Sequence, residues 1–214
     1  MKLLYVVSGQ SYSSTEPSRK IAALVRCWRE MGHEVELICG GDISDPPPES
    51  SDAAQRMKRV TPPWYRTNSY LAPIVNSISE IKNIRHDRRL AKFVSERIRV
   101  FKPDLYLQRA SRLDGQTLSI AIQARIPTVL EWKDAYVCSP EVLKALGPPP
   151  PRNSPYGVSL FKWYARRVET YKESSVDFII VESGLLKTRL SRELNRESDR
   201  FVVAHNAVNM ADFD

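Results

Sequence analysis

The sequence predicts an α/β protein whose strands form one parallel, doubly wound sheet. Leu3 to Val7 is a continuous apolar run, which is typical of a strand buried on both faces of such a sheet. Apolar residues then recur at helical spacing from Ile21 to Met31, where Gly32 ends the helix, and Val35 to Cys39 is a second apolar run. Strand, helix and strand in close succession form a βαβ unit, which indicates a parallel sheet.

The same alternation continues along the chain and completes a six-stranded, Rossmann-like pattern. Ser183 is expected to cap the helix that begins at Gly184, because a serine hydroxyl accepts from the free N–H groups of a first turn. The remaining expected elements are a helix from Ile78 to the residues before Pro103, a strand Leu105–Leu107, a helix Leu113–Ala124, a strand Pro127–Glu131, a helix 158–173, a strand Asp177–Val181, a helix 184–195 and a strand Phe201–Ala204.

Two irregular insertions interrupt this order, at about 44–76 and 136–156. Prolines, the last of them Pro73, exclude a continuous helix in the first insertion, and a run of four prolines marks the second. We expect one Rossmann-like domain over residues 1–204. The polar turn over residues 205–214 is expected to begin a linker to a second domain.

The charge balance favours an anionic partner, because the formal net charge is +7. Such a partner is a nucleic acid, an anionic lipid surface or a phosphorylated substrate. The three cysteines form no CxxC pair, which indicates neither a zinc site nor a disulfide framework and fits a reducing cytoplasm. No signal peptide and no membrane-spanning apolar run is evident, and we expect no metal and no cofactor.

Residues 82–102 are strongly basic, with eight Lys or Arg against Asp87 and Glu96, a net charge of +6. Apolar residues are expected on the opposite side of this helix, among them Ile81, Ile84, Phe93 and Ile98. One interpretation is a solvated face on a helix that packs on the core. The other is docking to anionic lipid, on the inner face of a membrane.

Several segments, in order along almost the whole chain, resemble GT-B glycosyltransferases, especially the large retaining family 4. The resemblance is carried by Lys2–Val7, Ile21–Leu24, Met31–Leu37, Pro127–Asp134, Asp177–Ser183 with Leu186 and Lys187, and Val203–Asn209 with Phe213. It implies that this chain is the N-terminal, acceptor-side half of a GT-B fold. The nucleotide-sugar donor would then bind mainly to a second Rossmann-like domain, and the chain alone would be inactive.

The resemblance also implies a reaction, the transfer of a sugar from a nucleotide-sugar donor to a hydroxyl of a glycan or lipid-linked acceptor. The family has His-Asp after the strand that ends at Glu131, where this chain has Lys133-Asp134. We take Lys133 and Asp134 as candidate catalytic residues. A lysine there would act as a point cation on developing phosphate charge, and Asp134 would orient its neighbours. The alternative is that Lys133 is only a solvated loop residue.

Other candidate site residues lie at the carboxyl ends of the predicted strands, where ligands bind in this fold. Arg109 and Arg112 follow the strand Leu105–Leu107 and either contact a phosphate or acidic sugar, or are exposed arginines on a loop. The remaining candidates are Gly9, Gln10 and Ser11 after the first strand, and His205 and Asn206 after the last.

Two other function classes compete with glycosyl transfer. A Rossmann-type nucleotide-binding module that is not a transferase is the first alternative, although no G-x-G-x-x-G follows the first strand. Nucleic-acid binding through the basic helix ranks last, because no zinc, ribonucleoprotein or helix-turn-helix signal accompanies the charge. We therefore expect no nucleic-acid partner.

Overall fold

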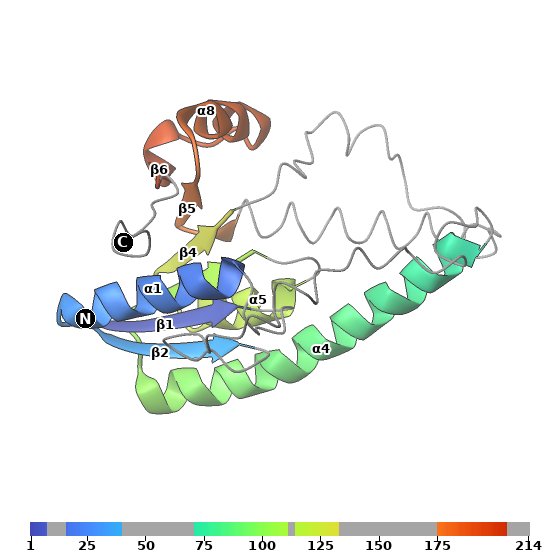
Figure 1. Ribbon diagram of the computed structural model, residues 1–214, viewed down its shortest axis with the longest axis horizontal. Helices are drawn as coiled ribbons and strands as arrows, with labels where there is room; N and C mark the ends of the chain where they lie inside the picture. The colour runs from blue at the N-terminus through green and yellow to red at the C-terminus, as the bar shows by residue number, and fades with distance from the viewer. Residues whose placement is uncertain (8–15, 40–70, 111–113, 133–174, 205–214) are drawn as a thin grey trace, which may run out of the picture.

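The computed structural model describes residues 1–7, 16–39, 71–110, 114–132 and 175–204. Its centre is a six-stranded sheet in the order β2-β1-β3-β4-β5-β6, and every neighbouring pair is parallel (Figure 1). The strands are β1 (Lys2–Val7), β2 (Glu34–Cys39), β3 (Leu105–Arg109), β4 (Thr128–Glu131), β5 (Phe178–Val181) and β6 (Phe201–Val203). The predicted parallel, Rossmann-like α/β sheet is confirmed.

The direction in which the chain builds the sheet reverses between β1 and β3. From β1 the chain moves outward to β2, whereas β3, β4, β5 and β6 follow one another toward the opposite edge. In open sheets of this kind, ligands bind beyond the carboxyl ends of the strands at such a reversal. The topology therefore marks the carboxyl ends of β1 and β3 as the place to look for a site.

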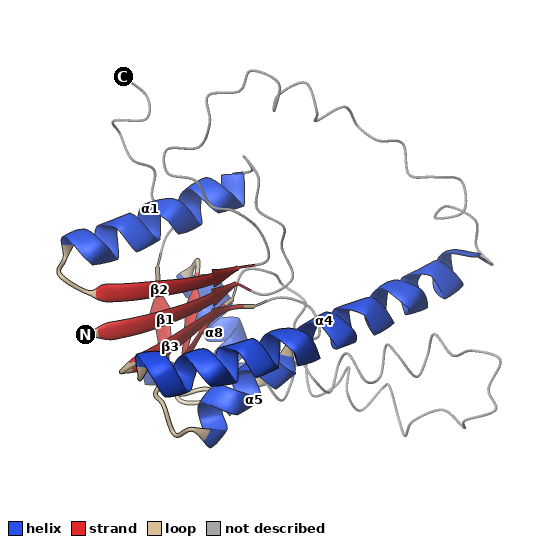
Figure 2. Cartoon of the chain, turned by 90° about the horizontal axis from the view of Figure 1, so that it is seen from below, coloured by secondary structure: helices blue, strands red, loops and turns tan. Residues whose placement is uncertain are grey.

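Helices cover the two faces of the sheet unequally in the described part of the chain. Helix α1 (Glu16–Glu30) packs Ile21 and Val25 against one face, where alternate residues of β1 meet them. Helices α4 (Leu71–Phe101), α5 (Gly115–Gln123) and α8 (Gly184–Glu193) contribute to the core on the other face. Figure 2 shows α1 on one side of the strands and α4 and α5 on the other.

Two helix ends follow their sequence signals closely. Gly32 has φ of +84°, a left-handed conformation that suits glycine after the last turn of α1. The backbone N–H of Leu186 donates to the Ser183 side chain at 3.2 Å, which is the predicted cap of α8. Both predictions are confirmed. The 3-10 turn η1 (Ser198–Arg200) then leads into β6.

Helix α4 begins earlier than the sequence predicted. It starts at Leu71, so the irregular stretch expected over 44–76 does not extend to its predicted end. Pro73 lies in the first turn, where the N–H that proline lacks would have no helical acceptor, so it does not prevent a helix there. Residues 44–70, the insertion at 136–156 and the expected helix 158–173 lie outside the described residues.

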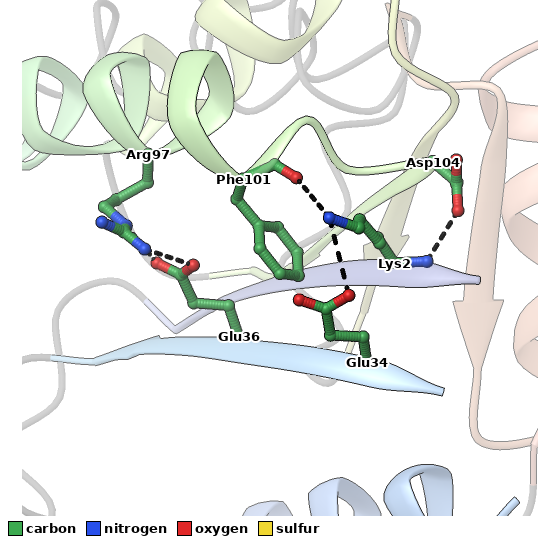
Figure 3. Close-up of polar contacts among 6 residues, drawn as sticks. All are labelled: Lys2, Glu34, Glu36, Arg97, Phe101 and Asp104. Carbon is green, nitrogen blue, oxygen red and sulfur yellow. Dashed lines mark hydrogen bonds and ion pairs between the residues drawn. The ribbon is translucent and has the colours of Figure 1, made fainter. Parts of the chain in front are cut away.

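Polar contacts hold the carboxyl end of α4 and the residues after it against β1 and β2 (Figure 3). Arg97 makes a two-pronged contact with Glu36, in which Nη2 donates to Oε2 at 2.8 Å. At the sheet end, the Lys2 backbone N–H donates to Asp104 at 2.6 Å. The opposite end of α4 extends past the carboxyl ends of the strands (Figure 1). The helix is therefore anchored at one end and projects beyond the sheet at the other.

Candidate functional site

A charged pair lies at the carboxyl edge of the sheet, beside the topological reversal. Arg109 is the last residue of β3, and it is the register partner of Val7 at the end of β1 and of Glu131 at the end of β4. The side chains of Arg109 and Glu131 belong to the sheet face that α1 covers, because they alternate with Gln108 and Leu130. Three adjacent strands therefore end in one row that contains a cation and an anion.

Both charged side chains are buried. Arg109 is 4% exposed and Glu131 is 7% exposed, and Arg109 Nη1 lies 3.7 Å from Glu131 Oε1. The other carboxylate oxygen, Oε2, accepts a 2.7 Å hydrogen bond from the Tyr5 hydroxyl of β1. The Tyr5 ring packs edge-on against Trp28 of α1, with 5.4 Å between ring centroids. We call Tyr5, Arg109 and Glu131 the edge cluster.

The electrostatics of the edge cluster keep Tyr5 protonated. Burial raises the pKa of Tyr5 far above its ordinary value, and the neighbouring Glu131 carboxylate raises the pKa further, while Arg109 opposes both. A tyrosine that keeps its proton can donate a hydrogen bond to a carboxylate oxygen, as Tyr5 does to Glu131 Oε2. Tyr5 is therefore a fixed donor that orients one oxygen of Glu131.

Two buried donors in the described part of the chain have no hydrogen-bond partner, and both lie at this edge. One is Arg109 Nη1, since 3.7 Å to Glu131 exceeds hydrogen-bond range. The other is Nε1 of Trp132, the residue directly after β4, which packs on the opposite sheet face. Buried donors are almost always paired in native proteins, so these two point to acceptors beyond the described residues, such as a ligand or water.

A second polar cluster holds the start of α5 against α4 and β3. Asp87 of α4 is buried, and its carboxylate accepts from the backbone N–H groups of Gln116 at 2.8 Å and Thr117 at 3.3 Å. These are free N–H groups of the first turn of α5, which its own N-cap residue Asp114 does not satisfy with its side chain. Gln108 of β3 donates to the Asp114 carbonyl at 3.1 Å. Asp87 therefore caps α5 although it belongs to another helix, α4.

Asp87 has an unusual proton affinity for an aspartate. Burial raises its pKa to about 6, the nearby Asp114 also raises the pKa, and the hydrogen bonds from Gln116 and Thr117 oppose this rise. The charged form is therefore favoured less strongly than in an exposed aspartate. Because Asp87 fixes the start of α5, its protonation state bears on the β3–α5 connection next to Arg109.

The structure describes only one of the predicted site residues. Arg109 was expected on a loop after a strand ending at Leu107, but β3 continues to Arg109 and the side chain is buried, so the exposed-loop alternative is wrong for this arginine. The other candidates lie outside the described residues: Gly9, Gln10, Ser11, Arg112, Lys133, Asp134, His205 and Asn206.

Sequence reasoning missed the residues that surround Arg109 and the cap of α5. Glu131 was not among the candidate site residues, although a carboxylate at the end of a mostly apolar strand is a signal for a charged partner. Tyr5 carried a weaker signal, as the one hydroxyl in an apolar strand. Asp87 could have been noticed as an acid within a basic run.

The solvent-facing side of α4 is basic and also apolar. The exposed basic residues are Lys82, Arg85, Arg88, Arg89, Lys92, Arg99 and, directly after the helix, Lys102. Phe93 is 50% exposed and Ile81 is 36% exposed, so the expectation that both pack on the core side was wrong, whereas Ile84 and Ile98 are partly buried. We call this surface the basic face of α4.

No group of three or more His, Cys, Asp or Glu side chains in the described part of the chain could hold a metal ion. No described helix, α4 included, combines the length and apolar character needed to cross a bilayer.

The comparisons with known proteins agree with this topology. The glycosyl transferase 4-like domain family matches residues 15–207. A search of curated protein sequences found no significant relative. Among solved structures, a glycosyltransferase from Rickettsia africae ESF-5 is similar over 100% of this chain and 45% of its own, with 15% identity and a TM-score of 0.52.

Two UDP-GlcNAc 2-epimerases have a similar fold. The enzyme from Methanocaldococcus jannaschii has 11% identity and a TM-score of 0.51, and the enzyme from Neisseria meningitidis, solved with UDP-GlcNAc bound, has 13% identity and a TM-score of 0.51. Each alignment covers 95% of this chain and 45% of the other. The chain thus spans about half the length of the structures that it matches.

The family match extends over most of the chain, and the parallel sheet has the fold of its structural neighbours. That fold is the Rossmann-like half of a GT-B protein. The chain belongs to the glycosyl transferase 4-like domain family.

Proposed function

We propose that this chain is the acceptor-side half of a retaining glycosyltransferase. The enzyme would move a sugar from a nucleotide-sugar donor to a hydroxyl of a glycan or lipid-linked acceptor. The observation that carries the proposal is the edge cluster, in which a buried arginine at the topological reversal has a donor with no partner in the described part of the chain. The family match supports the glycosyl-transfer role. Active sites of this fold class lie at that edge of the sheet.

The residues that follow the strands would complete the site. Lys133 and Asp134 come directly after Trp132, and we assign them to catalysis. In the transfer, the acceptor oxygen bonds to the anomeric carbon as the nucleoside diphosphate leaves with the bonding electrons, and the acceptor's hydroxyl proton passes to the leaving diphosphate oxygen. A positive Lys133 would offset the charge that develops on the leaving diphosphate, and Asp134 would orient it.

The remaining candidates would line the same wall of the site. Gly9, Gln10 and Ser11 follow β1, and Gly9 would let the backbone approach the donor diphosphate. Arg112 would contact a phosphate or an acidic sugar. His205 and Asn206 would line the cleft after β6.

The donor would bind mainly to a second domain. The solved structures with this fold are about twice as long as the chain, which covers 45% of them. Two sheets facing each other across a cleft can exclude water from the transfer. We therefore expect residues 1–214 alone to be inactive. We also propose that the whole enzyme acts in the cytoplasm.

Calorimetry on the full-length protein tests this proposal. A panel of nucleotide sugars, including the UDP-GlcNAc bound by the Neisseria protein, is expected to contain at least one that binds. Lys133→Met should slow turnover about 100-fold and leave donor affinity within about threefold, since its charge acts on the departing diphosphate. The absence of binding by every nucleotide sugar would contradict the proposal. Binding without release of the nucleotide in the presence of acceptors would favour the non-transferase nucleotide-binding module.

We also propose that the basic face of α4 rests on an anionic membrane surface, where a lipid-linked acceptor would be reached. Exposed arginines and lysines would contact lipid phosphates, and Phe93 would enter the interface. Each basic residue near such a surface contributes about 1 kcal/mol. The Lys82 end of this face is the end nearer the carboxyl ends of the strands, past which the start of α4 projects (Figure 1).

Co-sedimentation with phosphatidylglycerol and phosphatidylcholine vesicles measures this contact. The full-length protein should prefer the anionic vesicles, and Arg85→Glu/Arg89→Glu should reduce its partition onto them about tenfold or more. The matched control is Arg125→Glu/Arg192→Glu, which changes net charge equally at exposed positions away from α4. Equal loss in both variants would mean that only total charge matters, and negligible binding to both vesicle types would remove the proposal.

A further inference from the structure

The unpaired donor of Arg109 has a defined environment that selects its acceptor. Arg109 is 4% exposed, and Nη1 has no hydrogen-bond partner among the residues that the structure describes. The nearest carboxylate oxygen, Glu131 Oε1, lies 3.7 Å away, which is too far for a direct hydrogen bond. Leaving a buried charged donor unsatisfied is costly, so this position favours an acceptor oxygen beyond those of the described residues.

The spacing of the two groups fits one oxygen between them. An oxygen that lies about 2.8 Å from each partner can contact both atoms of a pair that is 3.7 Å apart. Such an oxygen must accept from Arg109 and donate to Glu131. A hydroxyl group can do both, whereas an ionised phosphate or carboxylate oxygen can only accept and would be repelled by Glu131.

The charge of the edge cluster also excludes a net anion site. Arg109 and Glu131 carry opposite charges in a buried pair, so their fields largely cancel for a ligand that contacts both. The Tyr5 hydroxyl occupies Oε2 of Glu131 and leaves Oε1 for the ligand. The cluster is therefore built for a neutral group, although an arginine at this position suggested a phosphate or an acidic sugar from sequence alone.

We propose that the edge cluster binds one neutral sugar hydroxyl, to which Arg109 donates and from which Glu131 Oε1 accepts. This inference rests on the proposed function, in which the sugar is the acceptor. Tyr5 is then a positioning residue, because it touches Glu131 and holds the free oxygen toward Arg109. The site is therefore expected to bind a hydroxyl group in preference to a phosphate.

A side-chain NMR signal of Arg109 gives a direct readout. The full-length protein is labelled with ¹⁵N-arginine, and the Nε–H signal that disappears in Arg109→Lys is assigned to Arg109. Neutral methyl glycosides of glucose, mannose and N-acetylglucosamine are titrated, and inorganic phosphate is titrated at the same ionic strength. We expect at least one glycoside to shift the signal in a saturable way and phosphate to leave it unchanged. A shift with phosphate alone, or with no probe, overturns the inference.

Variants separate a binding role from a merely structural one. Glu131→Gln removes the negative charge but keeps an acceptor for Tyr5, so phosphate should now shift the signal and glycoside affinity should fall at least fivefold. Tyr5→Phe removes the hydrogen bond that orients Glu131, so glycoside affinity should fall severalfold. Because the charge of Glu131 is kept, phosphate should still leave the signal unchanged. The control Glu182→Gln alters a carboxylate at the same edge that pairs with Lys20 at 3.8 Å, and should change glycoside affinity less than twofold.

The two proposals can fail separately. Nucleotide-sugar binding with a silent Arg109 signal would overturn the hydroxyl site and leave the transferase proposal standing. A glycoside that shifts Arg109 in a protein that binds no nucleotide sugar would do the reverse. Phosphate that still fails to shift the signal of a folded Glu131→Gln variant, checked by its thermal melt, would contradict the charge argument.

Discussion

Replacing Arg109 with methionine is expected to lower the free energy of unfolding by about 3–5 kcal/mol. The reason is that Glu131 would keep a charge at 7% exposure after losing its neighbouring cation. Methionine is similar in length to the arginine stem, so little of the loss would come from packing. Urea unfolding of the full-length protein, followed by tryptophan fluorescence, measures the change.

The double variant Arg109→Met/Glu131→Gln separates charge from shape. Both charges are then absent, and the glutamine amide still accepts from Tyr5, so the cost should fall to less than about 2 kcal/mol. Lys20→Met is the control, because the Lys20–Glu182 pair lies at the same edge with side chains 27% and 34% exposed and should contribute less than about 1 kcal/mol. Equal losses in the single and double variants would contradict a charge effect.

Asp87→Ala is expected to lower the free energy of unfolding by about 2–4 kcal/mol, because it removes the carboxylate of α4 that caps α5. The variant leaves the backbone N–H groups of Gln116 and Thr117 without their acceptor, in a buried place where water cannot fully replace it. Asp87→Asn keeps the shape and one acceptor oxygen and should cost less than half as much. The exposed Asp199 provides the control, since Asp199→Ala should change stability by less than about 0.5 kcal/mol.

The pH dependence of stability supplies a second test of Asp87. Its folded pKa of about 6 lies above the ordinary value of 3.8, so the folded state holds this proton more tightly than the unfolded state does. Stability from this group is therefore present below pH 3.8 and is lost as the pH rises to about 6. The amount is on the order of 2 kcal/mol. The difference in stability between wild type and Asp87→Asn should change by this amount between pH 4 and pH 7, and a constant difference would contradict the shift.

Most of the sheet could be predicted because its signals are local. Leu3 to Val7 reads as a strand buried on both faces, and all five residues are buried. Gly32 and Ser183 end and begin helices through contacts within a few residues. The strand boundaries that differ from the predicted ones have tertiary causes. Polar residues such as Lys2 and Arg109 extend strands because they pair with residues of neighbouring strands.

The candidate site was predictable only in part. The rule that ligands bind at the carboxyl ends of strands selected Arg109, and the topology confirms that this residue lies at that edge. Its environment was not predictable. Likewise, helical spacing could not place Phe93, because the direction in which α4 faces the sheet depends on what packs against it.

The sequence by itself determined the succession of strands and helices along the chain, because apolar periodicity and capping act between residues that are close in sequence. Only the tertiary structure decided which charges meet. Tyr5 and Glu131 are 126 residues apart in the chain, and Asp87 is 29 residues from Gln116, which it caps. Such pairings depend on strand order and helix packing, which bring distant side chains together and exclude water from them. The sequence suggested that Arg109 is a cation on a loop. In the folded chain it is buried beside Glu131 in a pair without net charge, and its Nη1 donor has no hydrogen-bond partner among the described residues.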